Sequence, residues 1–126
     1  MEATFEKHVQ ERAVLVGLNA DLFTKEQTAT QASLEELEAL LETAGGFCTA
    51  KVLQNRHTPD SHSFIGEGKA LEVKMLVEAT ASTMVVFDNE LSPGNIRALE
   101  EIIGGTGLDR SALILDIFAD QLDRAL

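Results

Sequence analysis

Short apolar runs alternate with longer stretches of helical periodicity along the whole chain. The run at residues 12–18 is rich in β-branched residues and the run at 83–87 is almost continuously apolar, as expected for strands that are buried on both faces of a parallel sheet. Residues 47–55, in which apolar positions alternate with polar ones, also read as a strand. A fourth, shorter strand is expected around Leu108. Between these runs, apolar residues recur every three or four positions, which predicts amphipathic helices. The pattern therefore indicates four strands that alternate with four helices.

Capping residues and glycines predict where these helices begin and end. Ser33 is placed to act as an N-cap with Glu36 as its capping-box partner, and Ser92 precedes a proline at a second helix start. Glycine pairs at 45–46 and 104–105 would end the first and third helices, because glycine takes the left-handed conformation without a steric penalty. The predicted buried stripes are Leu34, Leu37, Leu40 and Leu41; Leu71, Met75, Leu76 and Ala79; Ile96, Leu99, Ile102 and Ile103; and Leu113, Ile114, Ile117, Phe118 and Leu122.

The alternation of strands and helices predicts an α/β fold. Right-handed crossovers between successive strands give a four-stranded parallel sheet with helices on both faces, and we expect the strand order 2-1-3-4. The chain has 126 residues, of which 44% are hydrophobic and 25% charged. This composition suits a single domain over residues 1–126, in which residues 1–10 form a flexible or helical lead-in.

Composition excludes several classes of protein. No apolar run approaches the roughly 20 residues that a membrane span needs, and the first residues lack the features of a secretory signal, so we expect a cytoplasmic protein without a membrane partner. The net charge of −11 argues against DNA binding and against any broad grip on nucleic acid, so contact with RNA must be local. The single cysteine, Cys48, is expected to be a small core residue.

Loops at one edge of the predicted sheet carry nearly all of the residues that could do chemistry. Ligands of open parallel sheets bind outside the carboxyl ends of the strands. Segments 19–32, 56–69, 88–93 and 109–110 would converge there. The candidate site is therefore expected at this edge.

The first candidate is the turn that leads from a long polar loop into the helix after Lys69. Gly66 and Gly68 let the backbone approach a partner closely, and the first N–H groups of the helix can bind an anion. With Arg56 and Lys69, these glycines form a predicted contact for a phosphate group, either of RNA or of a nucleotide. Ala70 replaces the hydroxyl residue of a P-loop, so the turn is not a Walker-type site. The alternative is a purely structural turn beside a solvated lysine.

The second candidate is a cluster of charged residues after the third and fourth strands: Asp88, Glu90, Arg97, Asp109 and Arg110. In the structural interpretation, Asp88 caps the turn that follows it and Arg97 pairs with a nearby carboxylate. Asp109 then caps the last helix, and Arg110 reaches a carboxylate at the strand ends. We assign no catalytic residue, because no histidine, serine or cysteine with a clear role accompanies the carboxylates.

A metal site is not expected in this chain. His57, Asp60 and His62 lie close together in the sequence, but their spacing fits no standard zinc site and no fourth ligand is evident. We therefore interpret these residues as part of a solvated loop.

Four motifs, taken in order, carry a resemblance to a known family. They are Arg56-x-x-Pro59-Asp60; Phe64-Ile65-Gly66-x-Gly68-Lys69; Phe87-Asp88-x-Glu90-Leu91-Ser92-Pro93 with Arg97 and Leu99-Glu100; and Asp109-Arg110 followed by Leu113-Ile114-Leu115-Asp116-Ile117-Phe118-Ala119. The series resembles the amino-terminal domain of HflX-type GTPases from about Val14 to Ala119. This resemblance implies a domain that, within the full protein, docks on the large ribosomal subunit beside a GTPase domain and helps to rescue or split stalled ribosomes.

The sequence also departs from the family pattern. The family continues after Ala119 into a basic helix, whereas residues 120–126 are acidic here, and Asn95 and Ala98 replace longer or amide side chains. No Walker A motif and no Asn-Lys-x-Asp motif is present. We therefore expect that this chain is not an enzyme by itself, and that GTP and Mg²⁺ would belong to a GTPase domain outside it.

Three functions are predicted from these observations. The first is a non-catalytic domain that contacts the large ribosomal subunit through the loop at residues 56–69. The second is a module that binds a nucleotide or another phosphate ligand at the helix start between Gly66 and Lys69. The third is an interaction domain that forms a homodimer through its last helix.

Overall fold

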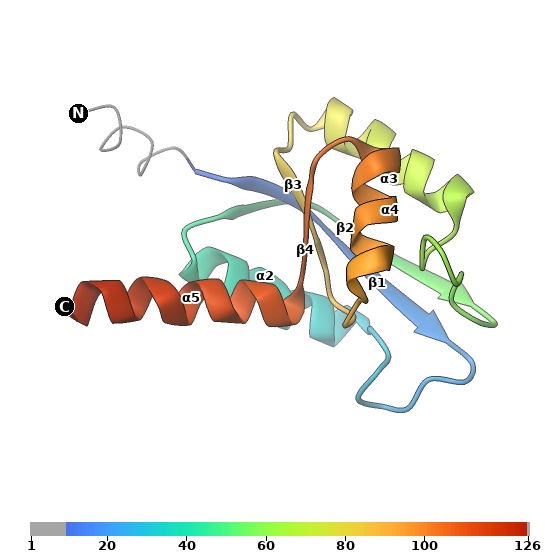
Figure 1. Ribbon diagram of the computed structural model, residues 1–126, viewed down its shortest axis with the longest axis horizontal. Coiled ribbons are helices and arrows are strands. Elements are labelled where there is room, and N and C mark those ends of the chain that lie inside the picture. The colour runs from blue at the N-terminus through green and yellow to red at the C-terminus, as the bar shows by residue number, and fades with distance from the viewer. Residues whose placement is uncertain (1–9, 126) are drawn as a thin grey trace.

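The computed structural model describes residues 10–125 and shows a parallel four-stranded sheet with helices on both faces (Figure 1). The elements are β1 (Arg12–Ala20), α2 (Gln31–Thr43), β2 (Phe47–Arg56), α3 (Glu67–Ala79), β3 (Met84–Phe87), α4 (Pro93–Ile103), β4 (Thr106–Asp109) and α5 (Arg110–Ala125). The strand order is β2-β1-β3-β4. The predicted fold class and strand order are confirmed. The lead-in predicted for residues 1–10 lies outside the described residues except for Gln10.

The central strand β1 supplies side chains to a core on each face of the sheet. Val14, Val16 and Leu18 pack under α3 and α4, whereas Ala13 and Leu15 pack under α2 and α5. All five are fully buried. Successive side chains of a strand point to opposite faces, so a continuous apolar run is required where helices cover both.

Helix α2 begins earlier than the sequence predicts. Its N-cap is Thr30, whose hydroxyl oxygen accepts a hydrogen bond from Ser33 N at 3.0 Å, while Thr30 N donates to Ser33 Oγ at 2.7 Å. The capping box therefore joins Thr30 to Ser33, and the predicted pairing of Ser33 with Glu36 is wrong. Both pairs have the same three-residue spacing, and the Ser33 hydroxyl also donates to Asp88, which fixes Ser33 inside the first turn.

Helix α3 also differs from its prediction, in its start and in its buried face. It begins at Glu67, and Ala70 and Val73 are its buried residues. Leu71 and Met75, which were predicted to be buried, are 47% and 68% exposed. Small residues face the sheet because the turn before α3 is itself buried and brings the first turn of the helix close to the strands.

The remaining helix ends agree with the sequence pattern. Ser92 Oγ accepts from Asn95 N at 3.1 Å at the start of α4, and Gly104 ends this helix in the left-handed conformation with φ 85°. In α5, Leu113 is buried but Phe118 is 58% exposed, so the predicted stripe is only partly internal. None of the helices in the described range is long and apolar enough to cross a membrane.

Candidate functional site at the strand ends

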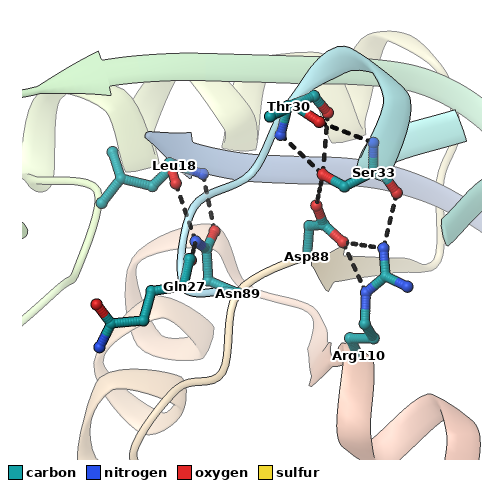
Figure 2. Close-up of polar contacts among 7 residues, drawn as sticks. All are labelled: Leu18, Gln27, Thr30, Ser33, Asp88, Asn89 and Arg110. Atoms are coloured by element: carbon teal, nitrogen blue, oxygen red, sulfur yellow. Dashed lines mark hydrogen bonds and ion pairs between the residues drawn. The ribbon is translucent and has the colours of Figure 1, made fainter. Parts of the chain in front are cut away.

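A buried ion pair joins three elements at the carboxyl end of the sheet (Figure 2). Asp88 follows β3, and its side chain is only 2% exposed. Arg110 Nε donates to Asp88 Oδ1 at 2.8 Å, and Arg110 Nη2 donates to the carbonyl oxygen of Ser33 at 2.7 Å. The Ser33 hydroxyl donates to Asp88 Oδ2. The pair therefore ties the start of α5 to the end of β3 and to the first turn of α2.

This arrangement confirms two predicted roles in the second cluster and corrects a third. Arg110 reaches a carboxylate at the strand ends, as predicted. Asp88 does not cap the turn that follows it, because Arg110 and Ser33 occupy its oxygens. Asp109 bonds that turn instead, because its Oδ2 accepts from Leu91 N at 3.2 Å. Its Oδ1 accepts from Ala112 N at 2.9 Å in α5, so Asp109 also caps the last helix, as predicted. The two buried carboxylates are thus engaged in structural hydrogen bonds.

Asn89 belongs to the same region but was not singled out in the sequence. Its amide continues the hydrogen bonding of β1: Leu18 N donates to Asn89 Oδ1 at 2.8 Å, and Asn89 Nδ2 donates to Leu18 O at 2.9 Å (Figure 2). Nδ2 also donates to Gln27 O at 2.8 Å, which holds the loop between β1 and α2. An amide directly after a buried strand and an aspartate was the available signal, because a primary amide carries a donor and an acceptor side by side, as a backbone peptide group does.

The other two members of the predicted cluster lie apart from this network. Glu90 is exposed and lines a cavity of about 430 Å³ together with Phe23, Phe64 and Arg110. Arg97 lies on the outer side of α4 and forms no ion pair with the carboxylates in the described part of the chain, so its predicted pairing is wrong. The cluster is therefore a structural core of three residues with two exposed neighbours.

The loop between β2 and α3 is held in one conformation by Asp60. Asp60 Oδ2 accepts from Ser63 N at 2.7 Å, from Ser63 Oγ at 3.0 Å and from His62 N at 3.0 Å. These hydrogen bonds, the Ser63 N–H first, lower the pKa of the Asp60 carboxyl below its ordinary value. A backbone bridge between Asp60 and Phe64 closes the turn. The loop is exposed at its tip and internally bonded.

Two side chains from neighbouring elements brace the same loop. Arg56 Nε donates to Thr58 O at 2.9 Å, and Arg56 Nη1 donates to Ile65 O at 3.3 Å. From α4, Asn95 Nδ2 donates to the carbonyl oxygens of Ser61 and His62 at 3.1 and 2.8 Å. Arg56, which we predicted as a partner contact, therefore holds the loop closed from within.

The two glycines of the predicted contact have different surroundings. Gly66 is buried, has φ 87°, and a Cβ at this position would lie 2.5 Å from Arg56 Nη1. Gly68 is exposed, and a Cβ there would meet nothing within 4 Å. Gly66 is thus required by the turn itself, whereas the fold places no such requirement on Gly68.

Lys69 and the helix start complete the predicted contact. Lys69 Nζ lies 3.8 Å from Glu72 Oε2, and its side chain is 26% exposed. In the part of the chain that the structure describes, no side chain caps the N-terminus of α3. The exposed backbone at Gly68 and the Lys69 ammonium group are therefore the parts of the predicted contact that an anionic partner could reach.

The histidines of the loop are not gathered around a metal position. His57 Nδ1 lies 2.8 Å from Asp21 Oδ2, and both side chains are largely exposed. Among the side chains that the structure describes, no group of three from histidine, cysteine, aspartate or glutamate is arranged to hold a metal ion.

Comparisons with known proteins show which family has a similar sequence. Residues 31–119 match the family described as GTP-binding GTPase N-terminal. The GTPase HflX of Lacrimispora saccharolytica is 37% identical over 115 residues, which are 91% of this chain and 26% of that protein. The GTPase HflX of Escherichia coli K12 is 39% identical over 111 residues, which are 88% of this chain and 25% of that protein.

A solved structure agrees with these matches at the level of the fold. A GTP-binding protein from the hyperthermophilic archaeon Sulfolobus solfataricus, in complex with GDP, has a TM-score of 0.63 and 20% sequence identity, over 87% of this chain and 30% of that chain. The chain spans about a quarter of the length of the curated relatives it matches. Because the family match covers most of the sequence, the chain belongs to the GTP-binding GTPase N-terminal family and corresponds to the amino-terminal region of HflX GTPases.

Proposed function

We propose that this chain is a non-catalytic docking domain of an HflX-type GTPase, and that it contacts the large ribosomal subunit through the loop at residues 56–69. The observation that carries the proposal is the loop at residues 57–63, which is exposed at its tip and held in one conformation by hydrogen bonds with the side chains of Asp60, Arg56 and Asn95. An ordered loop loses little conformational entropy when a partner binds, so less of the free energy gained from its contacts is offset by the cost of ordering the loop.

The contact surface is smaller than the sequence alone indicates. Gly66 is buried and Arg56 is engaged in the loop, so Gly68, Lys69 and the exposed His57 and His62 remain to meet a partner. Lys69 would pair with an RNA phosphate, and the backbone at Gly68 would allow that phosphate to approach closely. With a net charge of −11, such a contact must be local and weakened by salt.

The strand ends support a binding role over a catalytic role. Asp88 and Asp109 are buried, and their carboxylate oxygens accept hydrogen bonds from Arg110, Ser33 and backbone N–H groups. A general acid or base must instead reach a substrate proton. In this proposal, GTP and Mg²⁺ bind to a GTPase domain outside this chain. The chain itself would act in the cytoplasm, where ribosomes are found.

Co-sedimentation with purified large ribosomal subunits tests the proposal. The wild-type domain should pellet with the subunits, and Lys69→Glu should weaken binding by about tenfold or more, because it replaces an attractive phosphate contact with a repulsive one. Lys74→Glu, in the same helix and with the same charge change, is the matched control and should bind like the wild type. Equal binding by the two variants would remove the loop as the contact, and no pelleting of the wild type would overturn the proposal.

A phosphate ligand is the second candidate for the same helix start. It is favoured by one observation, the absence of a side-chain cap at the N-terminus of α3, which leaves the first N–H groups of the helix to other partners. Titration calorimetry with ATP and with GTP tests it. Heat that disappears in Lys69→Glu but persists in Lys74→Glu would support this candidate, and the absence of heat with both nucleotides would eliminate it.

A further inference from the structure

The strand β2 forms an edge of the sheet that lacks the usual protection. It has ten residues and stands at the end of the strand order, and no strand in residues 10–125 pairs with its outer side. The opposite edge strand, β4, has four residues, and Glu100 Oε2 accepts a hydrogen bond from Gly107 N at 2.9 Å. Long exposed edges can pair with another chain, so proteins usually shorten or cover them.

The outward backbone groups of β2 can be assigned from the ladder. Arg56 turns its backbone toward β1, because Arg56 O accepts from Asp21 N at 3.2 Å. Backbone direction alternates along a strand, so the N–H and C=O groups of Lys51, Leu53 and Asn55 face away from the sheet. No described residue provides a hydrogen-bond partner for these three N–H groups.

One flank of this edge is apolar. On the α3 side, a hollow of about 470 Å³ is lined mostly by apolar side chains, among them Val52, Met75 and Leu76, and two charged residues, Lys69 and Glu72, also border it. Met75 is 68% exposed although it borders this hollow. An exposed apolar hollow beside free backbone groups offers a place for the apolar side chains of an added strand.

The other flank is acidic. On the α2 side, Lys51 Nζ pairs with Glu38 Oε1, and this hydrogen bond, with a further contribution from Glu35, raises the pKa of Lys51. Glu38 and Glu42 add to the effect of burial in raising the pKa of the Cys48 thiol. Three carboxylates therefore lie within electrostatic reach of this side of β2, and one lysine opposes them.

We propose that β2 accepts an extended segment of a partner protein as an additional strand, and that this segment alternates apolar with basic residues. Side chains of an added strand point alternately to the two faces of the sheet. One set would enter the hollow beside Met75, and the other set would lie over the glutamates of α2. A second copy of this chain fits less well, because pairing β2 with itself brings two acidic α2 helices together.

A synthetic peptide tests this edge directly. The probe is a peptide of about nine residues that alternates valine and lysine, and its comparison peptide alternates valine and glutamate. Fluorescence anisotropy at low ionic strength should show binding of the valine–lysine peptide alone. Amide hydrogen exchange of Lys51, Leu53 and Asn55 should slow in the complex, because these N–H groups become hydrogen-bonded. A purely electrostatic contact would leave their exchange unchanged.

Variants of Leu53 and Met75 separate pairing from other effects. Leu53→Pro removes an outward N–H that the fold does not use, so the domain should fold and lose peptide affinity by about tenfold or more, whereas Leu53→Ala should change affinity by less than about threefold. Met75→Gln, at an exposed position, should weaken binding without affecting folding.

Three results would overturn the proposal. Equal affinity of Leu53→Pro and Leu53→Ala, with Met75→Gln like the wild type, would exclude strand addition. Equal binding of the glutamate peptide, or failure of both peptides to bind, would exclude a basic partner. Concentration-dependent dimers that Leu53→Pro converts to monomers would show that a second copy occupies the edge.

Discussion

Gly66 and Gly68 are two residues apart in the sequence, but the structure gives them different reasons to be glycine. Gly66 combines φ 87° with ψ 152°, a region that is essentially restricted to glycine, and the Arg56 guanidinium fills the space of a Cβ. Gly68 lies in the first turn of α3 with open space around it. The turn requires glycine at position 66, whereas the fold would accept another residue at position 68.

Substitution by alanine should separate these roles. Gly66→Ala should lower the free energy of unfolding by roughly 2 kcal/mol or more, because it combines backbone strain with a close contact to Arg56. Gly68→Ala should raise it by up to about 1 kcal/mol, because alanine is the better helix former. Urea denaturation of both variants measures the difference. Equal destabilisation by the two substitutions would contradict the assignment.

The Asp88–Arg110 pair should behave as a coupled unit. Arg110→Ala leaves the buried Asp88 carboxylate without its main partner and should destabilise the domain by about 3 kcal/mol, near the lower end for buried pairs because the arginine reaches solvent. Asp88→Asn in the same background should cost little more, since the pair is already broken and the substitution removes the carboxylate charge that was left unpaired. A double-mutant cycle in urea measures the coupling, and additive effects would show that the pair is not a unit.

Asp60 should make the stability of the domain depend on pH in the acid range. Its folded-state pKa is lowered, so the carboxylate form stabilises the loop at pH values above the ordinary value of about 4, and this contribution is lost as the pH falls through the folded-state pKa. Melting temperatures of the wild type should therefore fall below about pH 4 more steeply than those of Asp60→Asn. Parallel curves for the two proteins would remove Asp60 as the cause.

At the scale of elements, the sequence predicts strands and their order better than it predicts helix faces. β1 is recognisable because both of its faces are buried, and α4 is recognisable because Ser92 and Gly104 mark its ends. The exposed face of α3 was not predictable from periodicity, because Leu71 and Met75 repeat at helical spacing just as a buried stripe does. Only the anchored turn before α3 determines which face meets the sheet.

The candidate site shows the same limit. The convergence of the loops follows from the parallel sheet, and the pairing of Arg110 with a carboxylate follows from charge. The capping of the last helix by Asp109 follows from the helix-start pattern. The choice of Asp88 as the partner of Arg110 does not follow, because both residues are aspartates at strand ends. Which one meets the arginine depends on the position of α2, whose Ser33 completes the Asp88 contacts.

The corrected capping box at the start of α2 gives a test at this scale. Thr30→Ala should lower the free energy of unfolding by about 1 kcal/mol, because it removes the hydroxyl that accepts from Ser33 N. Glu36→Ala should be nearly neutral, since Glu36 is exposed and outside the capping box. Thermal denaturation of both variants measures the contrast. A larger loss in Glu36→Ala would restore the pairing that the sequence predicted.

At the scale of the whole molecule, the two ends of the sheet differ in how they are finished. The carboxyl end is tied together by hydrogen bonds that link β1, α2, β3 and α5 (Figure 2). Away from that end, α5 runs out past α2 (Figure 1) and carries two apolar side chains in water: Leu115 is 67% exposed and Phe118 is 58% exposed. They are three residues apart, so they lie on neighbouring positions of one helical face.

We propose that this face of α5 mediates formation of a homodimer. Burying two large apolar side chains from each copy is favourable by roughly 1.5–3 kcal/mol per side chain, which offsets part of the cost of association and gives a weak dimer. Sedimentation velocity of the wild type should show mass increasing with concentration, and a Leu115→Ser/Phe118→Ser variant should remain a monomer. A matched Leu71→Ser/Met75→Ser variant, which alters two exposed apolar residues on α3, should still dimerise. Loss of the dimer in the α3 variant, with retention in the α5 variant, would move the interface to α3.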